Sequence, residues 1–273
     1  MKRLLQSLSI IALSTSIFAQ EAADKKFQAG LVFGTGMNFM KMSTNKLVAD
    51  GIGSDVTIGA NMNFSFNDAI GITTGIEIDF ETFKYRPSGN AVYYHFRDKD
   101  IVRQVDLEAS DVLYELQTRK QKPIYISIPT MFIFRTKFIG YFRYFGKFGL
   151  RTSILGSNKI TDTGFEYAIG DNPVLTSGTS RNNENMSAAS ELIFIKTVGG
   201  FAGGAEWNFS GTTSLVAEMG FYFGITPLYW DRTVGNNQDK QFLHQKDDTG
   251  TENDYFSNGA THNQLRFKVS ILF

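Results

Sequence analysis

The chain has 273 residues, of which 42% are hydrophobic, 20% are charged and 14% are aromatic. This composition excludes a disordered chain, and the equal numbers of basic and acidic residues, 27 of each, argue against a nucleic-acid binder. The absence of cysteine excludes disulfide bonds and thiol chemistry. The 25 phenylalanines and 11 tyrosines give more aromatic surface than a soluble domain usually needs, and they are typical of a barrel that faces lipid.

The first nineteen residues predict a secretory signal peptide. Lys2 and Arg3 form a basic start, a mostly apolar stretch runs from Leu4 to Phe18, and Ala19 supplies a small residue for cleavage. The stretch is short for a membrane span, so a retained anchor helix is the less favoured alternative. Cleavage removes two basic residues and leaves 25 basic against 27 acidic residues, a net charge of −2. We therefore expect a signal peptide at 1–19 and one exported domain at 20–273.

Alternation of apolar and polar residues recurs along the rest of the chain and predicts β-strands that cross a membrane. In the best example, six apolar residues from Val56 to Phe66 alternate with polar residues or glycine. Most such segments exceed the roughly nine to eleven residues that a tilted strand needs to cross a bilayer. Eight segments are predicted, at 27–41, 52–66, 70–85, 123–135, 141–157, 191–209, 214–228 and 262–273.

The connections between these segments alternate between short and long. Short connections are expected at 67–69, 136–140 and 210–213, and long, polar ones at 42–51, 86–122, 158–190 and 229–261. Barrels of outer membranes combine short periplasmic turns with long extracellular loops. The predicted fold is therefore all-β, an eight-stranded antiparallel up-and-down transmembrane β-barrel with short periplasmic turns and long, solvated extracellular loops. Residues 91–96 and 112–116 could form strands as well. They leave two alternatives: a further hairpin, which would give a ten-stranded barrel, or an extension of the fourth strand beyond the membrane.

Charged side chains on the polar face of the strands predict the interior of the barrel. A narrow lumen holds few side chains, so we expect the bulky apolar residues to face lipid rather than to fill a soluble core. The charges then form a structural network in the lumen, with seven basic residues against five acidic ones; a conducting pore is the alternative. The predicted members are Glu77, Asp79, Glu81, Arg135, Arg143, Lys147, Arg151, Lys196, Glu206, Glu218, Arg266 and Lys268.

The C-terminal segment alternates from Leu265 to a terminal phenylalanine, Phe273. Strands that end in this way resemble the C-terminal signal that the barrel-assembly machinery recognises in outer-membrane proteins. We therefore expect the cell outer membrane as the location, and outer-membrane lipid and the barrel-assembly machinery as partners.

Two neighbouring strands carry a family resemblance. Residues 125–135 read Tyr-Ile-Ser-Ile-Pro-Thr-Met-Phe-Ile-Phe-Arg, and residues 141–151 read Tyr-Phe-Arg-Tyr-Phe-Gly-Lys-Phe-Gly-Leu-Arg. This pair resembles the outer-membrane β-barrel family of Bacteroidota that includes PorT-like proteins. The resemblance is specific over residues 124–156, and it implies an outer-membrane barrel. Through the PorT-like members it also implies a link to type IX secretion.

The three histidines are the candidates for catalysis. His95 and His244 lie in long loops, and His262 begins the last strand. No Gly-x-Ser-x-Gly motif and no histidine pair at metal-ligand spacing accompanies them, so we expect no enzyme activity, no cofactor and no metal site. The acidic segment from Asp247 to Asp254 lacks the spacing of a calcium-binding loop and is predicted to be a solvated surface.

An aromatic run in the second long loop is the candidate contact site. It consists of Tyr93, Tyr94, His95 and Phe96, and it is expected to be either a binding tip or an interfacial anchor. We expect a structural or protein-interaction role, as in a subunit of a secretion or envelope complex. A narrow pore or lipophilic-ligand conduit, which conductance would reveal, and a lipid-modifying enzyme that depends on a loop histidine are the alternatives.

Overall fold

The computed structural model describes residues 26–173, 175–188, 191–211, 213–230, 241–246 and 252–273. The predicted signal peptide at 1–19 lies outside these described residues. Within them, one sheet holds fifteen strands, and a short 3₁₀ helix, η1, spans Gln104–Asp106. No helix in this described part of the chain is long and apolar enough to cross a membrane.

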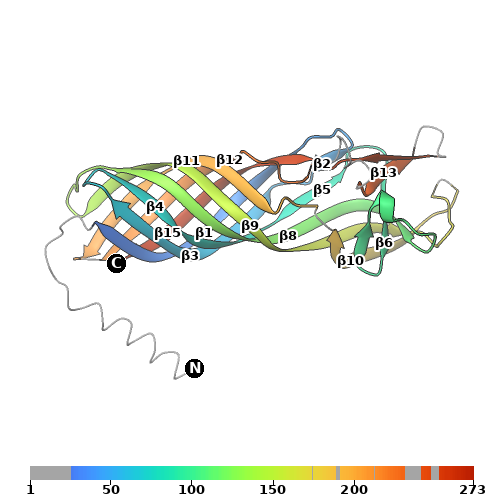
Figure 1. Ribbon diagram of the computed structural model, residues 1–273, viewed down its shortest axis with the longest axis horizontal. Coiled ribbons are helices and arrows are strands. Elements are labelled where there is room, and N and C mark those ends of the chain that lie inside the picture. The colour runs from blue at the N-terminus through green and yellow to red at the C-terminus, as the bar shows by residue number, and fades with distance from the viewer. Residues whose placement is uncertain (1–25, 174, 189–190, 212, 231–240, 247–251) are drawn as a thin grey trace, which may run out of the picture.

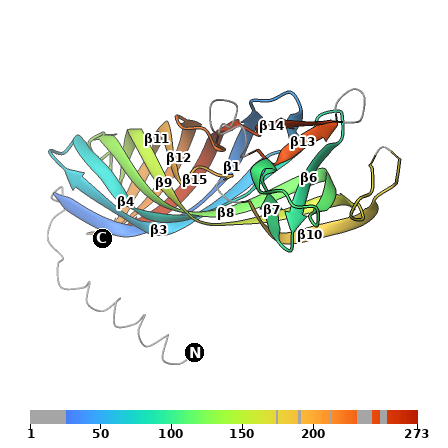
Figure 2. The same ribbon diagram turned by 45° about the vertical axis from the view of Figure 1, so that its right-hand side comes forward.

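Eight long strands pair in a closed antiparallel cycle, which we call the ring. Each strand pairs with the next one in the series, and the last pairs with the first, from Gly30 opposite Leu272 to Met42 opposite Ala260. Figures 1 and 2 show the ring with its strands oblique to the long axis of the molecule. In order, the ring strands are β1 (Phe27–Met42), β3 (Gly53–Ser65), β4 (Ile70–Glu81), β8 (Val112–Arg135), β9 (Phe142–Glu166), β11 (Ile195–Ser210), β12 (Thr213–Gly224) and β15 (Ala260–Leu272).

The all-β class is confirmed. The described residues form fifteen strands in all rather than the eight predicted, and eight of the fifteen make up the ring. The seven additional strands lie in segments that were expected to be long solvated loops. Most are too short to show an alternating pattern, and the longest, β10, is polar on both faces. They are β2 (Leu47–Ala49), β5 (Phe83–Pro87), β6 (Val92–Arg97), β7 (Asp100–Val102), β10 (Thr179–Ala188), β13 (Leu243–Lys246) and β14 (Asn253–Phe256).

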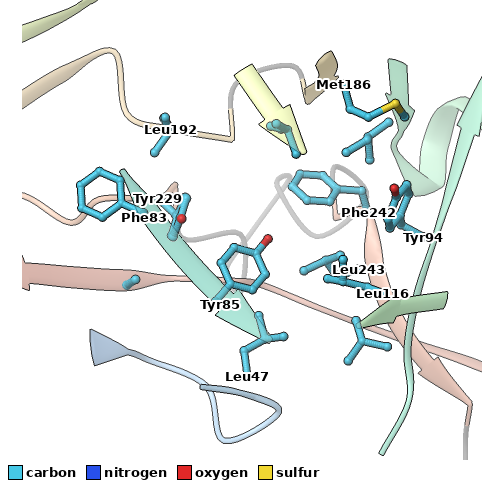
Figure 3. Packing of buried hydrophobic residues seen from close by; sticks show 14 of the residues in the cluster. Leu47, Phe83, Tyr85, Tyr94, Leu116, Met186, Leu192, Tyr229, Phe242 and Leu243 are labelled. Atoms are coloured by element: carbon cyan, nitrogen blue, oxygen red, sulfur yellow. The ribbon is translucent and has the colours of Figure 1, made fainter. Parts of the chain in front are cut away.

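These seven strands and the far ends of β8 and β9 (residues 112–122 and 158–166) form a folded unit at one end of the ring, which we call the loop-end lobe. Strand β8 extends well past the ring, and β6 pairs with this extension, from Val92 opposite Leu116 to Phe96 opposite Val112. Figure 3 shows apolar side chains from several strands converging inside the lobe, among them Tyr85 from β5. The long connections therefore build a second core of their own instead of a solvated surface.

The outer face of the ring is apolar, as expected for a surface that meets lipid. Leu31, Phe33, Ile58, Ile76 and Phe201 each expose more than half of their surface, between 52% and 65%. The polar side chains of the same strands point inward and are buried. A soluble barrel has the opposite arrangement, with apolar side chains inside and polar ones outside.

The C-terminus lies at the end of the ring opposite the lobe (Figure 1). The backbone N–H of Phe273 donates to the carbonyl of Ala29 at 2.8 Å, so the last residue is joined to the first strand. The turn between β3 and β4 at this end is tight, because the Asn67 side chain accepts hydrogen bonds from the backbone N–H groups of Ala69 and Ile70. We call this end the short-turn end.

Candidate functional site

The twelve charged residues predicted for the lumen all point into the ring. Eleven of them are buried, and Glu218 is partly exposed. Near the short-turn end, Arg143 donates to both carboxylate oxygens of Glu206, with N–O distances of 2.7 and 2.9 Å. Lys147 lies 2.6 Å from Glu218, and Arg135 donates to the Ser65 hydroxyl at 2.9 Å.

A larger charge cluster occupies the lumen between this end and the lobe. At its centre Arg266 lies 3.0 Å from both Asp55 and Asp79 and 3.1 Å from Glu81. Side chains that are paired and hydrogen-bonded in this way tolerate burial, so the cluster fills the lumen as a plug of ion pairs. The other ion pairs, at 2.6–2.8 Å, join Arg151 with Glu77 and Asp79, Lys196 with Glu81, and Lys268 with Glu77.

Asp55 belongs to this cluster but was not among the predicted members. It is 1% exposed and precedes the lipid-facing Val56, so the alternation of β3 could have identified it. With Asp55 included, six acidic residues face seven basic ones among the lumen residues described. Glycines in β1 make room for the long basic side chains: a Cβ at Gly34 would come within 3.0 Å of the Cγ of Lys268.

A second buried charge cluster lies in the loop-end lobe, around Arg119 of β8. Arg119 donates to both oxygens of Asp162 in β9, at 2.8 and 2.9 Å, and to Glu191 at 3.2 Å. The side chains of Gln121 and Asn258 also donate to Glu191, at 2.6 and 2.7 Å. Burial raises the pKa of Glu191, and the Arg119 guanidinium opposes that rise. This cluster connects distant segments of the lobe. It was not predicted, because Arg119 and Asp162 lie in expected loops and Glu191 lies at the first position of an expected strand.

The aromatic run of β6 lies in the core of the lobe rather than at an exposed tip. Tyr94 and Phe96 are buried, and their rings lie 5.1 and 6.1 Å from the ring of Tyr114. Tyr93 is also buried, and His95 is the most exposed member of the run. The alternation of this short strand directs Tyr94 and Phe96 inward, so these two side chains pack the lobe and do not present a contact surface.

His95 and His244 meet at the side of a pocket of about 400 Å³ in the lobe. Their rings are 5.3 Å apart and nearly parallel, with an angle of 20° between the planes. Asp111, Asp171 and Lys246 also line the pocket. Both ring nitrogens of His244 are buried without a hydrogen-bond partner in the described part of the chain. Sequence spacing could not predict this pair, because the two histidines come from different long connections.

The electrostatics of the pocket keep both imidazoles neutral. Burial, together with smaller effects of the neighbouring His95 and Lys246, lowers the pKa of His244 to about 3. Burial also lowers the pKa of His95, although Asp111 acts in the opposite direction. A neutral imidazole offers one hydrogen-bond donor and one acceptor, so the pair can hydrogen-bond an uncharged polar group in the pocket.

The described residues contain no group of three or more His, Cys, Asp or Glu side chains arranged to hold a metal ion. The acidic segment that begins at Asp247 lies partly outside the described residues, because the structure does not describe 247–251.

The family model described as "Outer membrane protein beta-barrel domain" matches residues 18–229 of the chain, which is more than half of its length. No curated protein matches the chain. The match covers seven of the eight ring strands and most of the loop-end lobe, and it ends before β13, β14 and β15.

Solved structures of outer-membrane proteins are similar to this chain at low sequence identity. OprG from Pseudomonas aeruginosa is 10% identical, with 93% of this chain and 98% of that chain covered and a TM-score of 0.37. The attachment invasion locus protein Ail of Yersinia pestis is 12% identical, with 91% and 100% covered and a TM-score of 0.32. Neisserial surface protein A is 9% identical, with 90% and 96% covered and a TM-score of 0.32.

Proposed function

Because the chain belongs to the outer membrane protein beta-barrel domain family, we propose that it is a non-enzymatic interaction protein of the cell envelope. The protein is located in the outer membrane. In our proposal the eight-stranded ring anchors it in lipid, with the short turns in the periplasm and the loop-end lobe outside the cell, as barrels of this kind are oriented. The lobe is then the part that meets other molecules.

The observation that supports this role best is the folded state of the lobe. Loops that only cover a barrel need no core, whereas this lobe has buried aromatic residues and the charge cluster around Arg119. At the same time it exposes apolar side chains far from the ring: Val105, Ile169 and Leu175 are 61%, 62% and 83% exposed. Exposed apolar side chains that gather into a patch mark binding surfaces for other proteins, and we propose that these residues contribute to one.

The finer assignment follows the resemblance of residues 125–151 to PorT-like barrels of Bacteroidota. We propose a partner from a secretion or envelope complex, with type IX secretion as the specific candidate. Insertion of the ring by the barrel-assembly machinery, directed by the strand that ends at Phe273, is part of the same proposal.

Crosslinking in intact cells, followed by purification and identification of the crosslinked proteins, tests this function. We expect one envelope protein to be recovered in a fixed ratio to the barrel. The double variant Val105→Asp/Ile169→Asp should lose that partner, because it places charges in the apolar contact surface. Ile139→Asp, at the exposed short-turn end, is the matched control and should retain it. Recovery that does not depend on the lobe residues, or no recovery at all, would contradict the interaction role.

A narrow pore is the second candidate, and the lumen disfavours it. The ion pairs around Arg151 and Arg266 occupy the interior of the ring, and small barrels are usually filled by their side chains. In planar lipid bilayers we therefore expect no stable conductance from the purified protein. Steady channels would favour the pore over the interaction barrel.

A lipid-modifying enzyme is the third candidate. A histidine that acts as a general base needs a hydrogen bond of roughly 2.6–3.2 Å to the group that it deprotonates. Both ring nitrogens of His244 are buried without a partner among the described residues, so no nucleophile or carboxylate is oriented by this histidine there. Loss of a lipid modification in a His244→Ala strain would contradict this part of the proposal.

A further inference from the structure

Four lysines lie next to one another on the outer surface of the sheet, where the ring continues into the loop-end lobe. They are Lys84 of β5, Lys120 and Lys122 of β8, and Lys159 of β9; we call them the lysine patch. Lys84 is directly opposite Lys120, and Lys122 is directly opposite Lys159, in the register of the paired strands. Each lysine is flanked along its strand by a buried residue, so all four side chains point outward.

None of the four lysines forms an ion pair in the part of the chain that the structure describes. Two acidic residues lie nearby: Asp50, whose backbone N–H donates to the Lys84 carbonyl, pairs with Arg86 at 3.7 Å, and Glu184 of β10 lies opposite Thr161 without an ion pair to the patch. Partial burial lowers the pKa of Lys120, and the nearby ammonium groups of Lys122 and Lys84 lower it further. Like charges at neighbouring positions of a sheet repel one another, so an anion bound from outside the chain would stabilise the patch.

The patch begins where the lipid-facing surface ends. Apolar residues face outward on the ring side of the patch: Phe80 on β4, Ile124 and Ile126 on β8, and Ile154 on β9. The polar residues Thr82 and Ser157 lie between this apolar surface and Lys84 and Lys159. Outward positions are about 6.6 Å apart along a strand, so the lysines lie within one or two such steps of the apolar surface. This is the depth at which lipid headgroups carry their phosphate groups, and basic clusters there attract anionic lipid.

We propose that the lysine patch binds the phosphate groups of an anionic lipid in the membrane leaflet on the lobe side of the ring. The acyl chains of that lipid lie along the apolar strip formed by β4, β8 and β9, while Lys84, Lys120, Lys122 and Lys159 surround its headgroup. The basic residues are concentrated on one side of the ring. On the far side, β1 carries one outward-facing lysine near the lobe, Lys41, which lies opposite Thr261.

Native mass spectrometry of the mature protein in a zwitterionic detergent, titrated with phosphatidylglycerol or with phosphatidylcholine, tests this site. We expect saturable binding of phosphatidylglycerol, at least about tenfold stronger than that of phosphatidylcholine, because each lysine adds to the attraction. The variant Lys84→Gln/Lys120→Gln/Lys122→Gln/Lys159→Gln should lose this preference. The same four positions changed to arginine should retain it, because the charge is kept.

A matched control neutralises four exposed lysines outside the patch, Lys26, Lys41, Lys99 and Lys137, and should bind phosphatidylglycerol as the unchanged protein does. Heat-dependent gel mobility verifies that each variant still forms a barrel. Equal binding of the two lipids, or an unchanged preference in the glutamine variant, would overturn the proposal. Competition by millimolar inorganic phosphate would overturn the assignment to a lipid and leave a soluble anion as the ligand. The assay uses purified protein, so its result is independent of the partner that the lobe binds.

Discussion

At the scale of single residues, Arg119 determines whether the loop-end lobe can fold. Its guanidinium is fully buried between the carboxylates of Asp162 and Glu191. Arg119→Ala leaves both carboxylates without their cation inside an apolar core, and such a loss costs about 3–5 kcal/mol. We expect a destabilised lobe on a preserved ring. Urea unfolding of a Trp207→Phe background, in which Trp230 near the lobe is the remaining tryptophan, would measure the loss.

Arg181→Ala is the control for that experiment. Arg181 pairs with Glu166 in the same lobe but is 51% exposed, and exposed ion pairs contribute roughly 0–1 kcal/mol. If Arg181→Ala and Arg119→Ala destabilised the lobe equally, the cluster around Arg119 would not be its main support.

His244 makes the lobe sensitive to acid. Its folded pKa of about 3 lies below the ordinary value near 6.5, so the opened state binds more protons between these values. The stability of the β13–β14 hairpin is therefore complete above pH 6.5 and declines as the pH falls toward 3, by about 1.4 kcal/mol per unit of pKa difference. Hydrogen exchange of the hairpin amides across this range should show earlier opening at low pH. His244→Phe should flatten the profile; a profile with the same slope would exclude His244 as the cause.

At the scale of elements, the contact between the extensions of β8 and β9 depends on Gly164. A Cβ at this position would come within 1.9 Å of the Glu115 carbonyl oxygen, so any larger residue separates the two strands. We expect Gly164→Val to make the lobe sensitive to protease while the ring keeps its heat-dependent gel mobility. Gly156→Ala on the same strand is the matched control, because its Cβ would lie 3.4 Å from the Ile124 carbonyl oxygen, an ordinary contact.

The environment of each strand explains whether it could be predicted from the sequence. β3 and β4 have one face toward lipid and one toward the lumen, and two uniform environments impose a regular alternation over a dozen residues. The strands of the lobe lack that constraint. In β10, from Thr179 to Ala188, most residues are exposed on both faces, and β7 has three residues, so neither leaves a periodic signal.

At the scale of the whole molecule, the proposed orientation in the membrane rests on the lengths of the connections, and the absence of cysteine makes it easy to measure. A cysteine introduced at Val105 in the lobe should react with a membrane-impermeant maleimide on intact cells. A cysteine introduced at Ile139, at the short-turn end, should react only after the outer membrane is opened. Both positions are more than 60% exposed, so a difference in side-chain exposure would not explain a difference in labelling. The reverse labelling pattern would mean that the lobe lies in the periplasm.

The candidate sites, like the strands, differ in whether they could be predicted from the sequence. The lumen residues could be predicted because each belongs to an alternating strand, and Asp55 follows the same rule. The His95 and His244 pair and the cluster of Arg119 with Glu191 join positions more than 70 residues apart or in different loops. These residues come together only when the lobe folds, so the pattern of neighbouring residues in the sequence does not predict their contacts.

The pairing of β15 with both β12 and β1 has a consequence for the order of folding. The final strand to be synthesised closes the ring against the first, and contacts of such long sequence separation form slowly. The contacts of β8 with β6 and of β8 with β9 are local and can form while the C-terminus is still being exported. A chain cut short before residue 260 would keep these contacts but leave β1 and β12 with unpaired edges, which are templates for aggregation. A periplasmic intermediate without β15 would therefore be an open sheet with two unpaired edges, and we expect it to be degraded rather than inserted.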